Sequence, residues 1–147
     1  MPDQASAELL AIYLEDARGQ LESLDHALLS LERDGLDPAV IAGVLGPLHT
    51  LKGNSGMLGF SSVKEYVHRL EDVFAGVSDG SLDIGAEVFD SLFAGASALR
   101  DAIEQACRTG AEVRDLSPEI AALDALLADV GGGAMPAGPL AVLPADE

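Results

Sequence analysis

Apolar residues recur along this chain every three or four positions, the spacing that gathers side chains on one face of an α-helix. The first such series is Leu10, Leu14, Ala17, Leu21, Leu24, Leu28 and Leu31. Asp34-Gly35 interrupts it, and Asp37 followed by Pro38 is typical of a helix cap with proline at the first helical position. The pattern therefore predicts a first helix of about seven turns and a second helix that begins at Pro38.

The second predicted helix runs from about Pro38 to Leu58, and Gly59 ends it. Its inward-facing positions are Ile41, Val44, Leu48, Leu51 and Ser55. A third helix is expected after a cap at Ser61 or Ser62. Its apolar series is Val63, Val67, Leu70 and Phe74. The turn residues at 78–81 then separate it from the next segment.

A fourth helix is expected before Thr109-Gly110, and a short fifth helix opens at Ser117-Pro118-Glu119. Their inward positions are Val88, Leu92, Ala96, Leu99 and Ile103 in the fourth helix, and Ile120, Leu123 and Leu127 in the fifth. No segment alternates with period two for long enough to predict a strand. Short connections between long helices indicate an all-α fold, an antiparallel up-down four-helix bundle with an appended fifth helix. We expect residues 1–130 to form this domain and the Gly/Ala/Pro-rich residues 131–147 to be a flexible linker or tail.

The charge of the chain limits its partners. Its 147 residues include 8 Lys+Arg and 25 Asp+Glu, a formal net charge of −17. Such a surface repels the phosphates of nucleic acid and of anionic membranes, so we expect neither as a partner. The first residues lack a signal-peptide pattern, no apolar stretch is long enough to span a bilayer, and Cys107 has no cysteine to pair with. These features predict a cytoplasmic protein.

The segment Leu48–Phe60, LHTLKGNSGMLGF, carries the candidate chemistry. At about 100° per residue, His49 lies roughly 120° from the apolar series of its helix, so it should face solvent. Gly46, Gly53 and Gly56 fall within about 60° of it. Glycine weakens a helix interior by roughly 0.5–1 kcal/mol relative to alanine. Close helix packing could explain glycines on the apolar face, but these lie on the other side, which favours a surface that another protein approaches.

A neutral imidazole has a nucleophilic nitrogen, so an exposed histidine can carry a phosphoryl group covalently. Lys52, one turn beyond His49, can reach a phosphoryl oxygen there and offset its charge. The other ring nitrogen must hold a proton, and an acceptor is needed to fix that tautomer. Glu71 is the candidate, because it lies with His68 on a flank of the third helix that can meet His49 if the two helices pack antiparallel. The spacing permits this contact without requiring it.

The H-T-L-K-G-x-S-x-x-L-G-F pattern that begins at His49 resembles the histidine phosphotransfer (HPt) domain, most closely the N-terminal one of CheA-type chemotaxis histidine kinases. His68 and Glu71 fall where that family has a second histidine and a glutamate. The resemblance implies that His49 is the phosphoacceptor, that Glu71 orients its ring, and that His68 and Lys52 join the network.

The same resemblance implies the partners. An ATP-binding kinase domain, using ATP and Mg²⁺, would phosphorylate His49, and a response-regulator receiver domain would accept the group on an aspartate. This domain would bind no cofactor and have no kinase activity of its own, while the parent protein would be a histidine kinase.

Other interpretations of the same residues are a stand-alone phosphorelay protein and a helical adaptor that binds a receiver without chemistry. Two histidines and a glutamate could also bind zinc, but HExxH spacing is absent. Neither GxxxxGK[ST] nor GxGxxG occurs, so no nucleotide-binding motif is present. His26, on the exposed side of the first helix and without neighbouring glycines, is interpreted as a solvated surface histidine, and Cys107 as a packing residue.

Overall fold

The computed structural model describes residues 4–133, and all of the regular structure in this range is helical. The helices are α1 (Gln4–Asp34), α2 (Pro38–Met57), α3 (Ser61–Ser78), α4 (Ala86–Thr109) and α5 (Ser117–Gly133). These bounds confirm the five predicted helices and the all-α fold class.

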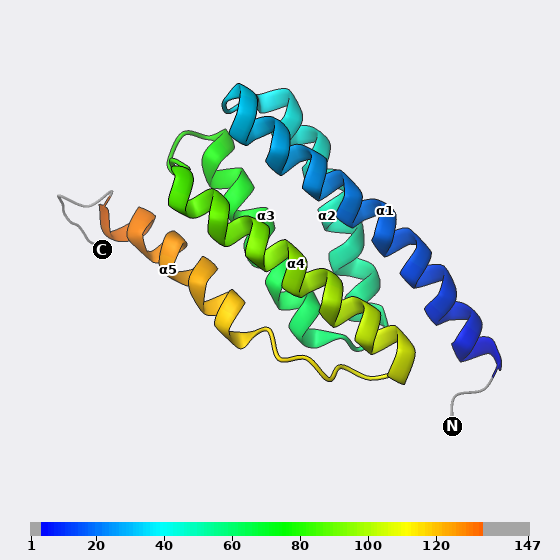
Figure 1. Ribbon diagram of the computed structural model, residues 1–147. Helices are drawn as coiled ribbons and strands as arrows, with labels where there is room; N and C mark the ends of the chain where they lie inside the picture. The colour runs from blue at the N-terminus through cyan, green and yellow to red at the C-terminus, as the bar shows by residue number, and fades with distance from the viewer. Residues whose placement is uncertain (1–3, 134–147) are drawn as a thin grey trace.

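The first four helices form a bundle in which each helix packs against two others (Figure 1). α1 contacts α2 and α4, while α3 contacts α2 and α4. α2 and α4 are therefore diagonal to one another. The connection after α4 crosses one end of the bundle, and α5 then packs mainly against α3 (Figure 1). This is the antiparallel four-helix bundle with an appended helix that the pattern predicted.

Local signals set most helix ends where the sequence predicted them. The Asp37 side chain accepts a hydrogen bond from the Ala39 backbone N–H at 2.9 Å and caps α2. Gly59 has φ +80° after the end of α2, and Gly110 has φ +83° after the end of α4. Because side chains with a Cβ rarely adopt this conformation, glycine allows the chain to leave each helix sharply.

The predicted cap of α3 is wrong. Phe60 occupies the N-cap position, and the first turn is capped instead by Glu112 from the α4–α5 connection. Its carboxylate accepts hydrogen bonds from the backbone N–H groups of Ser62 at 3.1 Å and Val63 at 2.9 Å. Ser62 Oγ in turn accepts a hydrogen bond from the Leu116 N–H at 3.2 Å. A carboxylate suits this place because free N–H groups and the helix dipole both favour negative charge there.

The hydrophobic core lies between the four bundle helices. Its largest fully buried side chains are Tyr66, Phe74, Leu21, Leu24, Leu28, Leu31, Ile41, Leu48, Leu51, Leu70, Leu92 and Leu99. The predicted inward positions are buried, with partial exposure at helix ends such as Leu10, Val88 and Leu127. Helix α5 extends to Gly133, beyond the predicted domain end at residue 130, and residues 134–147 of the predicted linker lie outside the described residues.

Candidate functional site

His49 projects from the middle of α2 into solvent, with 73 % of its side chain exposed. Its neighbour Leu48 and the following Leu51 are fully buried. Packing on one side of α2 therefore holds the backbone while the imidazole on the other side stays accessible. The exposure predicted for His49 is confirmed.

Glu71 of α3 supplies the acceptor for the ring of His49. Its Oε2 lies 3.2 Å from His49 Nδ1, and only 16 % of the Glu71 side chain is exposed. An ionised carboxylate only accepts hydrogen bonds. Nδ1 must therefore carry the ring proton and donate a hydrogen bond to Glu71. That tautomer leaves the lone pair on Nε2, which is therefore the nucleophilic nitrogen of this ring.

Lys52 holds the other oxygen of the same carboxylate. Its Nζ lies 2.8 Å from Glu71 Oε1, and 23 % of its side chain is exposed. The sequence placed Lys52 beside His49, where it could meet a phosphoryl oxygen; the structure shows it paired with Glu71. The pair holds Glu71 in position and keeps a cation within one helical turn of His49. The structure thus brings His49, Lys52 and Glu71 together, and their roles in phosphotransfer stay predictions.

His68 does not join this contact. It is exposed on α3, one helical turn before Glu71, and within the described part of the chain its side chain makes no hydrogen bond or ion pair. The role implied by the family resemblance for His68 stays a prediction. His26 of α1, which was predicted to be a solvated surface histidine, is also exposed.

The three predicted docking glycines differ in their surroundings. A Cβ added at Gly46 or Gly53 would meet no heavy atom within 4 Å, so the backbone is open to solvent at both positions. At Gly56 a Cβ would lie 3.2 Å from Cδ of Lys64, a residue of α3. Gly56 therefore provides room for a neighbouring side chain as well as belonging to the face around His49.

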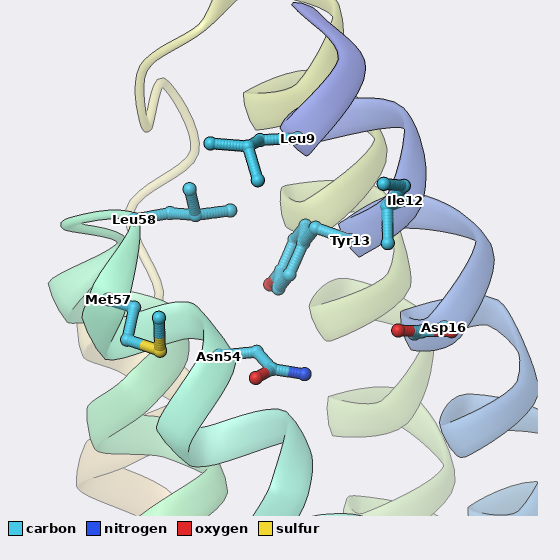
Figure 2. A pocket seen from close by; sticks show the side chains of 7 residues that line it. All are labelled: Leu9, Ile12, Tyr13, Asp16, Asn54, Met57 and Leu58. Carbon is cyan, nitrogen blue, oxygen red and sulfur yellow. The ribbon is translucent and has the colours of Figure 1, made fainter. Parts of the chain in front are cut away.

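An apolar hollow of about 240 Å³ lies between α1 and α2, at the end of α2 beyond His49 (Figure 2). Its rim includes Leu9, Ile12 and Met57, and Met57 is 85 % exposed. Tyr13 forms the floor, where its ring packs edge-on against Phe60 with ring centres 5.5 Å apart. Burial raises the pKa of the Tyr13 phenol to about 12, so this group is neutral at physiological pH.

Within residues 4–133, no group of three or more His, Cys, Asp or Glu side chains is placed to hold a metal ion. No helix among the described residues is long and apolar enough to cross a membrane.

Comparison with known proteins agrees with this geometry. The Hpt domain family matches residues 8–132. The chain belongs to the Hpt domain family. Among curated relatives, this Hpt domain is 28 % identical over 125 residues to the chemotaxis protein CheA of Halobacterium salinarum and 29 % identical over 122 residues to that of Listeria monocytogenes. These alignments cover 85 % and 83 % of this chain but only 19 % and 20 % of those proteins. The chain thus spans about a fifth of the length of these relatives.

Solved structures show the same fold. The phosphorylated P1 domain of CheA3 in complex with CheY6 from R. sphaeroides superposes with a TM-score of 0.73 at 27 % identity, covering 86 % of this chain and 98 % of that one. The CheA phosphotransferase domain from Thermotoga maritima gives a TM-score of 0.63 at 29 % identity, covering 67 % and 94 % of the two chains. The predicted resemblance to CheA-type phosphotransfer domains is confirmed.

Two residues that shape this Hpt domain's site were not predicted from the sequence. Glu112 caps α3, the helix that carries Glu71, and Lys64 lies across Gly56. The capping signal could not be read from the chain because Glu112 is about 50 residues from the helix it caps. Lys64 could have been identified as one of only eight cations, but its position over α2 depends on how α2 and α3 are aligned.

Proposed function

We propose that this chain is a phosphoryl carrier of two-component signalling, with His49 as the phosphoacceptor. The observation that carries the proposal is the contact between His49 Nδ1 and Glu71 Oε2 on an otherwise exposed ring. It leaves Nε2 unprotonated on a side chain that is 73 % exposed, where the reactive centre of another protein can reach the ring. The match to the Hpt domain family supports the same assignment.

In the first step, the ATP-binding domain of a histidine kinase presents the γ-phosphoryl group to His49. The Nε2 lone pair forms the P–N bond as the bond to the leaving ADP oxygen breaks. Nδ1 keeps its proton, and the positive charge of the phosphorylated ring is stabilised by Glu71. ATP and Mg²⁺ belong to the kinase domain, so this domain is a substrate in the first step and needs no cofactor of its own.

In the second step, an aspartate of a response-regulator receiver domain accepts the group. A carboxylate oxygen forms the new P–O bond as the P–N bond breaks, and the lone pair returns to Nε2. The open backbone at Gly46 and Gly53 gives the loops of either partner room to approach the ring. The complex of a related P1 domain with CheY6 supports a partner of this class.

We further propose that the chain is the N-terminal part of a cytoplasmic chemotaxis-type sensor kinase. Support comes from the curated relatives, which are CheA proteins about five times as long as the matched region. A stand-alone phosphorelay protein is the alternative, and a kinase region downstream of residue 147 in the parent gene would decide between them.

The test of the carrier function uses the purified chain, ATP and the ATP-binding kinase domain of the parent or of a close relative. We expect acid-labile, base-stable phosphate on the wild type and none on His49→Gln. His26→Gln is the matched control, because it removes an exposed histidine on another helix and should be labelled like the wild type. Equal labelling of His49→Gln and the wild type would exclude His49 as the acceptor, and a non-catalytic adaptor would be labelled in no variant.

A further inference from the structure

Lys64 lies on the same face of the molecule as His49, although it belongs to another helix. Its stem crosses α2 at Gly56, where a Cβ would lie 3.2 Å from Lys64 Cδ and 3.9 Å from Nζ. Gly56 is seven residues beyond His49, which corresponds to about 10 Å along the helix and roughly 20° of rotation. The Lys64 side chain therefore lies on the same side of α2 as His49, about two helical turns further along, and it takes no part in the contacts of Glu71.

The charge of Lys64 is free to act on a partner. Five of the six arginines and Lys52 form ion pairs with carboxylates of this chain. Among the described residues, Lys64 and Arg108 have no such partner. Arg108 is in the last turn of α4, the helix diagonal to α2. Lys64 is thus the one cation near His49 that no carboxylate in the described part of the chain neutralises.

This isolated charge matters because the rest of the molecule is acidic. At a net charge of −17, most of its surface repels any partner that approaches with negative charge. A receiver domain is such a partner at its reactive end, because its acceptor is an aspartate and the divalent cation that assists phosphoryl transfer is held by further carboxylates. A local cation beside His49 would attract and orient this end against the general repulsion.

We propose that Lys64 is a docking residue for the receiver domain, pairing with an acidic side chain of the receiver when its acceptor aspartate is over His49. This inference rests on the proposed carrier function. Gly56 makes this position possible, because the missing Cβ lets the aliphatic part of the Lys64 side chain lie across α2, on the side of the helix that carries His49. Because Gly56, where the Lys64 side chain crosses α2, is about 10 Å along the helix from His49, Lys64 acts on the encounter of the two proteins and leaves the bond-making step to His49, Lys52 and Glu71.

The experiment starts from protein that the kinase domain has already phosphorylated on His49. If the carrier function is wrong, the protein stays unlabelled at this stage, before the role of Lys64 is tested. The acceptor is a receiver domain that takes the phosphoryl group from the wild-type chain. We expect Lys64→Gln to lower kcat/KM of transfer about two- to five-fold at low ionic strength, the range of a single exposed ion pair. The loss should be in KM, with kcat at saturating receiver unchanged, and it should shrink as salt is added.

Two variants control this measurement. Arg108→Gln removes the other unpaired cation with the same change in net charge, and it should transfer like the wild type at every salt concentration. Lys64→Arg keeps the charge and should retain most of the wild-type rate. The proposal is overturned if Lys64→Gln transfers at the wild-type rate in low salt, if Arg108→Gln loses as much as Lys64→Gln, or if the change falls on kcat alone. It is also overturned if only phosphorylation by the kinase slows, because Lys64 would then serve the kinase domain.

Discussion

The two faces of α2 are built from the same twenty-residue segment but obey different physical requirements. The inner face carries Ile41, Val44, Leu48, Leu51 and Ser55, all of them buried. The outer face carries His49 between Gly46 and Gly53, where the backbone is open to solvent. Burial of the inner face compensates for a sequence that is poor for a helix, since it includes four glycines and an internal proline, Pro47. Stability is therefore concentrated on one face and chemistry on the other.

The neighbouring residues Leu48 and His49 give the largest test of this separation. Leu48→Ala should lower the free energy of unfolding by about 2–5 kcal/mol, because it leaves a cavity in the core. His49→Gln should change it by less than about 0.5 kcal/mol, as expected for an exposed side chain. Urea unfolding followed by circular dichroism measures both values. Similar losses in the two variants would show that the faces are not separate.

Glu71 connects the site to α3, and Glu71→Gln should affect activity far more than stability. The amide keeps the size of the side chain but loses the charge that holds Lys52 and orients the His49 ring. We expect phosphorylation of His49 to slow by about 10- to 100-fold, the usual cost of misplacing a reactive group. Single-turnover labelling by the kinase domain measures the rate. Labelling at the wild-type rate would remove Glu71 from the mechanism.

Gly53→Leu tests whether the outer face must stay bare. A Cβ at this position meets no heavy atom within 4 Å, and the substitution should raise helix stability by up to about 1 kcal/mol. Transfer to the receiver should nevertheless fall about ten-fold, because the side chain stands one turn from His49 and blocks the approach of the partner. Gly19→Leu, on the exposed face of α1, is the matched control and should transfer normally. If both variants transfer equally well, the glycines are not needed for access.

Tyr13→Phe should have the smallest effect, and only on stability. Ser55 Oγ donates to the Leu51 carbonyl at 2.7 Å and accepts from the Tyr13 hydroxyl at 2.7 Å, so the variant loses one buried hydrogen bond. The expected cost is about 1 kcal/mol at neutral pH.

The pH dependence of stability tests the same phenol. Burial raises the pKa of Tyr13 to about 12, whereas an unfolded tyrosine ionises near pH 10. The wild type should therefore lose stability as the pH rises from about 10 through 12. Tyr13→Phe should lose less over that range but should still lose some stability, because burial also raises the pKa of Tyr66 and of Cys107. Parallel curves for the two proteins would contradict the assigned shift.

Much of the fold could be predicted because its signals are local. Each of these signals determines the structure of residues close to it in the sequence. They are the apolar spacing within each helix, the Asp37-Pro38 cap, and the glycines after α2 and α4. The solvent exposure of His49 followed from the same periodicity. The cap of α3 was predicted wrongly because Ser61 and Ser62 look like local caps, whereas Glu112 performs this function from a connection far along the chain.

The pattern of apolar and small residues was enough to define the helices of this protein and the bare face around His49, since both depend on rotation about a single helix axis. Which side chains meet across helices was decided by tertiary packing. Glu71 reaches His49 and Lys52, and Lys64 reaches Gly56, only because the core aligns α2 and α3 at one relative height. That alignment arises from the fit of many buried side chains distant in the chain, and no local pattern contains it.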